Sequence, residues 1–108
     1  MTYGDALSAL ADPTRRQVFE RLKDGPKSVG VLAKHVPVSR PAVSQHLKVL
    51  REAGLVTERA EGPRHVYSID PKGLAALRAW LDQFWEQALV SFAAEVDRET
   101  NQEKEGQS

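Results

Sequence analysis

Hydrophobic positions recur every three or four residues in the first part of the chain, which is the period of an α-helix. Residues 3–10 carry one such apolar face. The dipeptide Asp12-Pro13 predicts the start of a second helix, because an aspartate side chain accepts hydrogen bonds from free amides and proline fits the first turn. The inward stripe of this second helix consists of Val18, Phe19 and Leu22.

Two serines mark the starts of the next two helices. Ser28 is expected to cap a short helix that ends before Pro37, because proline disfavours helical geometry in the residue before it. Ser39 starts a fourth helix, and Gly54 can adopt the left-handed conformation that closes it. The inward stripes of these helices are Val29, Leu32 and Ala33 in the first and Val43, Leu47 and Leu50 in the second.

A two-stranded hairpin and a long helix follow. Short, partly alternating runs at residues 55–60 and 65–69 are joined by turn residues at 61–64. Asp70-Pro71 then repeats the helix-start signal. The long helix that it predicts has apolar residues at 74, 77, 81, 84, 85, 88, 89, 92 and 96.

The chain of 108 residues has room for one domain, to which we assign residues 1–99. Residues 100–108 are polar, and we expect them to form a disordered tail. The absence of cysteine excludes disulfides and thiolate metal ligands. There is no apolar run long enough to span a bilayer and no signal-peptide pattern, so we expect a cytoplasmic protein without a membrane partner.

The formal net charge is zero, but the charges are segregated along the chain. Residues 25–69 carry seven Lys or Arg and three acids, a net charge of +4, whereas residues 71–108 carry four and seven, a net charge of −3. A basic middle and an acidic end suit a protein that presents one face to phosphates. Chance segregation on a solvated surface would give the same balance, so charge alone leaves both interpretations open.

The third and fourth helices and the hairpin make a winged helix-turn-helix, a mainly α (α+β) fold of four helices, two strands and a last helix. Because the major groove of B-DNA admits one α-helix, the second helix of the unit needs polar and basic side chains outward and apolar ones behind. Residues 39–53 have this pattern. A polar solvent face has a similar composition, but a basic hairpin tip beside it is more specific, and this tip carries Arg59, Arg64 and His65.

Two stretches of the chain, ALADPTRR at residues 9–16 and SRPAVSQHLKVLREAGLV at 39–56, resemble the ArsR family of bacterial repressors. The resemblance covers roughly residues 5–97, and Phe84-Trp85 is similar to a non-metal, autorepressor-like subgroup. It implies a repressor that binds double-stranded DNA as a homodimer, with the helix of residues 39–53 in the major groove and the hairpin as a wing on the backbone or minor groove. By position, the implied DNA-contacting residues are Ser39, Arg40, Pro41, Ala42, Ser44, Gln45, His46, Lys48, Arg59, Arg64 and His65.

The apolar stripe of the last helix predicts a dimer interface. It holds two tryptophans and two phenylalanines, more aromatic surface than one small domain readily buries, and homodimer cores favour aromatic residues. The alternative is a helix that packs wholly on its own domain. The expected interface, completed by the first helix, consists of Tyr3, Leu7, Leu10, Leu77, Trp80, Leu81, Phe84, Trp85, Ala88, Leu89 and Phe92. A two-fold dimer presents two reading helices, so we expect the operator to be an imperfect palindrome.

The chain departs from the metal-sensing members of that family. These use cysteines before the turn or Asp/His pairs in the last helix, whereas this chain has no cysteine and its histidines, His35, His46 and His65, lie outside the last helix. We therefore expect no metal and no cofactor. Without a glycine-rich phosphate loop or a nucleophile elbow we do not expect an enzyme.

Two further hypotheses stay open at this point. One is a protein-docking module, which would carry an apolar patch where the basic helix start lies. The other adds a small-molecule effector near Trp80 and Trp85, although dimer packing accounts for the same residues.

Overall fold

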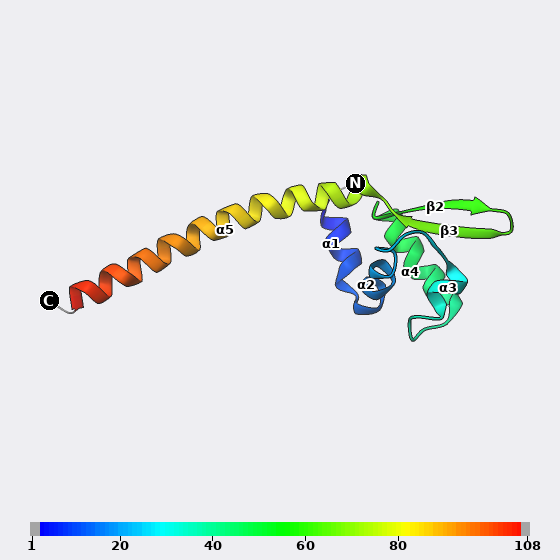
Figure 1. The fold of residues 1–108 in the computed structure, drawn as a ribbon, viewed down its shortest axis with the longest axis horizontal. Coiled ribbons are helices and arrows are strands. Elements are labelled where there is room, and N and C mark those ends of the chain that lie inside the picture. The colour runs from blue at the N-terminus through cyan, green and yellow to red at the C-terminus, as the bar shows by residue number, and fades with distance from the viewer. Residues whose placement is uncertain (1–2, 107–108) are drawn as a thin grey trace. The chain divides into compact units, whose positions relative to one another are not determined.

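The structure, a computed structural model, describes residues 3–106, with side chains for residues 4–101. The chain divides into two compact units, Met1–Leu77 and Arg78–Ser108. The predicted order of elements is confirmed, with one short strand added (Figure 1). The elements are α1 (Tyr3–Ala11), α2 (Pro13–Glu20), β1 (Lys27–Ser28), α3 (Val29–Ala33), α4 (Arg40–Glu52), β2 (Val56–Glu61), β3 (Arg64–Ile69) and α5 (Pro71–Gly106).

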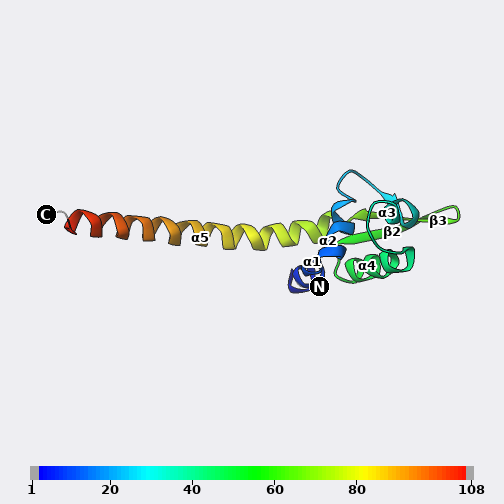
Figure 2. The same ribbon diagram turned by 90° about the horizontal axis from the view of Figure 1, so that it is seen from below.

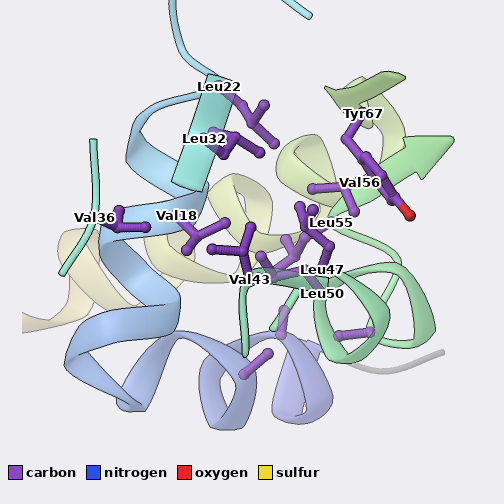
Figure 3. Close-up of a cluster of buried hydrophobic side chains, with 13 residues drawn as sticks. Val18, Leu22, Leu32, Val36, Val43, Leu47, Leu50, Leu55, Val56 and Tyr67 are labelled. Atoms are coloured by element: carbon purple, nitrogen blue, oxygen red, sulfur yellow. The ribbon is translucent and has the colours of Figure 1, made fainter. Parts of the chain in front are cut away.

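One hydrophobic core joins the helices and the sheet of the first unit (Figure 3). Helix α4 contacts α1, α2, α3 and β2, and Figure 2 shows it alongside α3 and β2. Full burial of a valine or leucine contributes about 1.5–3 kcal/mol, so α4 is firmly held. The side chains with no exposed surface are Val18, Leu32, Val43, Leu47, Leu50 and Leu55. Leu22 is also buried, whereas Phe19, Val29 and Ala33, which were predicted to face inward too, are half-buried and pack against this core.

The helix starts follow the predicted capping chemistry. Asp12 Oδ1 accepts a hydrogen bond of 2.9 Å from the Arg15 amide, and this bond is the main cause that lowers the pKa of Asp12. Ser28 Oγ accepts a bond of 3.3 Å from the Val31 amide. Both bonds satisfy amides that have no partner within their own helix, so the two side chains fix where α2 and α3 begin.

The predicted two-stranded hairpin is present as β2 and β3, and β1 adds a third strand, which gives an antiparallel sheet with the order β1-β3-β2. Lys27 lies opposite Tyr67, and Ser28 lies opposite Val66. A strand of two residues is too short to produce a period in the sequence, so β1 was not predicted. Because Ser28 also caps α3, this pairing ties the start of α3 to the middle of β3.

The first turn of α5 packs closely on the end of α4. Gly54 has φ +79°, the left-handed conformation that was predicted for it. A Cβ atom added to Gly73 would lie 1.8 Å from the Gly54 carbonyl oxygen, so the helix can approach only because Gly73 has no side chain. Asp70 Oδ1 accepts a 2.9 Å bond from the Lys72 amide at this start.

Helix α5 continues through Gly106, which differs from the predicted disordered tail at residues 100–108. Gln, Glu and Lys have good helix propensity, and extending an existing helix avoids the cost of nucleation. Residues 107 and 108 lie outside the described residues. No helix within residues 3–106 combines the length and the apolar character of a membrane span.

Candidate nucleic-acid interface

Helix α4 separates an apolar inner face from a polar outer one. Ser39 precedes it in an extended conformation (φ −69°, ψ 162°), and its Oγ accepts a 3.3 Å bond from the Ala42 amide. Pro41 occupies the first turn. The inner stripe of Val43, Leu47 and Leu50 is fully buried, so the helix cannot rotate without breaking the core.

The outer face carries most of the predicted base- and phosphate-contacting residues. No hydrogen bond or ion pair from the side chains of Arg40, Gln45 or Lys48 is present among the described residues. These donors are therefore free to meet a partner molecule. The exposed predicted residues on this face are Ser39, Arg40, Pro41, Ser44, Gln45 and Lys48.

His46, which was predicted to face outward, is half-buried, and so is Ala42, another of the implied DNA contacts. His46 follows Val43 by three positions, which puts it at the edge of the buried stripe. Its Nδ1 is buried and has no partner within the described part of the chain. The pKa of Asp12 is lowered mainly by the hydrogen bond from the Arg15 amide, and the charge of His46 is a smaller cause in the same direction.

The wing is β2, β3 and the two-residue loop between them. The cross-strand pair of Glu61 and Arg64 closes this loop. Gly62 has φ +60°, which is the requirement of a type II′ turn at its first central position. Pro63 takes the second position, where its fixed φ is tolerated.

The three predicted wing contacts differ in their availability. Arg59 is paired with Glu61 (3.1 Å between Nη2 and Oε1), and His65 Nδ1 lies 2.6 Å from Glu58 Oε1. Arg64 is exposed and has no ion-pair partner among residues 4–101. Arg64 is therefore the wing cation with its whole charge available to a phosphate.

A cleft of about 650 Å³ opens between α3, the start of α4 and the tip of the wing. It is lined by the basic side chains Lys34, Arg40 and Arg64, and none of its lining residues is acidic. Lys34 was not among the predicted contacts, because it follows the first helix of the helix-turn-helix and only the folded chain brings it beside Arg40. Three cations from three elements at one cleft suit a polyanion.

The predicted dimer-interface residues fall into both units. In the first unit Leu7 of α1 is exposed, whereas Leu10 and Leu77 are half-buried against the core. The side chain of Tyr3 lies outside the described residues. Leu10 and Leu77 therefore serve the core of their own unit at least in part.

In the second unit the apolar stripe of α5 is exposed. Trp80 is half-buried and stacks on Phe84, with ring centroids 6.0 Å apart and planes at 12°. Val90, which was not predicted as an interface residue, is 71% exposed. Leu81, Phe84, Trp85, Ala88, Leu89 and Phe92 are also exposed. Exposed apolar surface of this extent is typical of an interaction face.

The chain is similar to known regulators over most of its length. A helix-turn-helix domain family matches residues 10–59. The HTH-type transcriptional regulator Rv2034 of Mycobacterium tuberculosis is 60% identical over 94 residues, which cover 87% of this chain and 88% of that protein. The transcriptional repressor SdpR of Bacillus subtilis is 31% identical over 80 residues, 74% of this chain and 89% of SdpR.

Solved structures agree with these relatives. An ArsR family transcriptional regulator, RHA00566, superposes with a TM-score of 0.71 at 33% identity, over 79% of this chain and 93% of its own. The chain belongs to the ArsR family. A second solved structure, of a possible transcriptional regulator for arsenical resistance, has a TM-score of 0.71 at 49% identity, over 84% of this chain and 95% of its own. The ArsR fold thus confirms the winged helix-turn-helix that the sequence predicted.

Proposed function

We propose that this ArsR-family protein is a sequence-specific, DNA-binding transcriptional repressor that acts as a homodimer on an imperfect palindrome. The observation that carries the proposal is the outer face of α4, where free polar and basic side chains lie on a helix whose inner stripe is fully buried. In this proposal α4 enters the major groove, and the wing lies on the backbone or in the minor groove. Steric occlusion of a promoter then suffices for repression.

Each side chain of the interface has a role in this proposal. Gln45 reads adenine and Arg40 reads guanine, each with two hydrogen bonds. Lys34 and Arg64, which line the same cleft, each bind a phosphate, and Lys48 binds a third. Arg59 and His65 contribute less than Arg64, because carboxylates already pair with them. Pro41, Ala42 and Ser44, in the first turns of the helix, contact the DNA in this proposal, and the half-buried His46 lies at the edge of this contact surface.

The exposed stripe of α5 and Leu7 of α1 supply the two-fold interface in this proposal. Aromatic side chains such as Phe84, Trp85 and Phe92 gain the most from burial against a second copy. In such a dimer we expect the two copies of α4 to lie about 34–36 Å apart, which is one turn of B-DNA, or a multiple of that distance. Repression without a metal signal is supported by the absence of cysteine and the position of all three histidines outside α5.

Selection of duplexes from a random pool tests this proposal, followed by titration of the selected duplex and a scrambled version with the full chain. We expect an inverted repeat and a clear preference for it over the scrambled duplex. Gln45→Ala should cost about 1–3 kcal/mol at one base pair of each half-site, whereas Gln87→Ala on α5 should cost nothing there. Equal loss of affinity for both duplexes in the Gln45 variant would exclude base reading by Gln45, and failure to enrich any duplex would favour a protein-docking module.

A further inference from the structure

Glu58 connects three elements that the proposed DNA contact uses. Its carboxylate accepts a hydrogen bond from the guanidinium of Arg51, near the end of α4. The same carboxylate lies 2.6 Å from Nδ1 of His65 on β3. Glu58 itself belongs to β2, so one side chain joins both strands of the wing to α4.

The environment of Glu58 is more covered than that of a surface ion pair. Its side chain is 19% exposed, against 48% for Arg51 and 62% for His65. Tyr67 lies directly opposite Glu58 in the sheet and is buried. Burial raises the pKa of Tyr67, and the nearby charge of Glu58 raises it further. Ion pairs in such partly buried places are screened less by salt than those in open solvent.

The second carboxylate of the wing provides a contrast within the same strand. Glu61 pairs with Arg59, two positions earlier in β2, and both side chains are well exposed. That pair joins no two elements. Glu58 and Glu61 thus carry the same charge on the same strand, but only Glu58 links the wing to α4.

We propose that Glu58 is a positioning residue, which fixes the wing relative to α4 through Arg51 and His65 and so sets how sharply the protein discriminates between DNA sequences. The inference rests on the proposed function, because it concerns the same DNA contact. A carboxylate near phosphates repels them, which weakens binding to every sequence. Glu58 is useful because it pre-organises the wing. When the wing is held in place, α4 can read the bases in one register only.

The two carboxylates make the effect measurable. Glu61→Ala and Glu58→Ala each remove one negative charge, so both should tighten binding to scrambled DNA by a similar factor. Glu58→Ala also frees the wing. We expect the ratio of affinities for the selected and scrambled duplexes to fall roughly threefold to tenfold in Glu58→Ala and to stay within about twofold in Glu61→Ala.

A second readout separates positioning from simple loss of stability. Hydrogen exchange of the amides of β2 and β3 should quicken in Glu58→Ala while the amides of α2 and α4 keep their protection. Arg51→Gln should lower the same affinity ratio, and the double variant should lose no more than the stronger single one, because both remove one link. If Glu58→Ala does not fold, Glu58→Gln and Glu61→Gln replace the pair in the same comparison.

Equal affinity ratios in the Glu58 and Glu61 variants would overturn the inference, as would additive losses from Arg51 and Glu58. These failures differ from a failure of the proposed function. In the latter case the unaltered protein itself would show no preference for any selected duplex.

Discussion

Replacement of Arg64 by alanine tests how the protein meets the DNA backbone. Arg64 has no ion-pair partner among the described residues, and the same holds for Lys34, Arg40 and Lys48. Each cation that neutralises a phosphate of B-DNA adds about −0.9 to the slope of log K against log salt. Arg40 is assigned to a guanine, so if Arg64, Lys34 and Lys48 each meet one phosphate, they contribute roughly −2.7 per protomer and about −5.4 per dimer. Arg64→Ala should flatten the slope by about 0.9 per protomer, or 1.8 for the dimer.

The assay is fluorescence anisotropy of a labelled duplex, titrated with the full chain at five or more salt concentrations. Arg59→Ala is the matched control, because Arg59 belongs to the same wing but is paired with Glu61. We expect its slope to change by much less than that of Arg64→Ala, and affinity for selected and scrambled DNA to fall by similar factors in Arg64→Ala. An unchanged slope in Arg64→Ala would refute the phosphate contact, and equal slopes in the two variants would refute the argument from free and paired cations.

Three further predictions concern the fold and the dimer. Gly73→Ala should destabilise the protein by about 1–3 kcal/mol in urea unfolding, because the new Cβ would lie 1.8 Å from the Gly54 carbonyl oxygen. Lys72→Ala is the control, and a urea midpoint of Gly73→Ala above that of Lys72→Ala would contradict the close packing. The pKa of Asp12 is lower in the folded protein than its usual value of 3.8, so its carboxylate stabilises the fold above that pH and the contribution disappears as pH falls through the folded pKa. Asp12→Asn should lose this part of the pH dependence in a series of urea titrations, and identical pH curves would count against the cap. Phe84→Glu should lower the mass measured by light scattering from twice the chain mass of 12.0 kDa to the mass of one chain, because it puts a charge into the proposed α5 interface. The control Gln87→Glu should keep the dimer mass, and a Phe84→Glu variant that is still a dimer would argue against the α5 interface.

The element order followed from the sequence because its signals are local. Asp12, Ser28 and Ser39 each cap a helix through a side chain that reaches an amide three residues later, and that chemistry can be read without tertiary context. The positive φ of Gly54 is of the same kind. The buried stripe of α4 also obeyed its period, since a helix on a core repeats its inward positions regularly.

Features that depend on contacts between residues far apart in the chain could not be predicted from the sequence. Strand β1 exists only because Lys27 and Ser28 meet β3 almost forty residues away. The free state of Arg64 and the pairing of His65 with Glu58 depend on the register of the wing, which decides which acids on β2 lie near each residue of β3. Lys34 lines the cleft only because the folded chain brings it beside Arg40, which no local pattern predicts. The half-burial of His46 reflects its place at the edge of the stripe, where a pattern of apolar and polar residues gives no clear side.

The central claim is that α4 lies in the major groove, and atomic substitution in the selected duplex tests it most directly. Replacement of one guanine at a time by 7-deazaguanine removes the N7 acceptor from the major groove, and replacement by inosine removes the 2-amino group from the minor groove. The account predicts that deazaguanine at the same position of both half-sites weakens binding about tenfold, and that the loss disappears in Arg40→Ala. Binding that tolerates every N7 deletion but responds to inosine would contradict it.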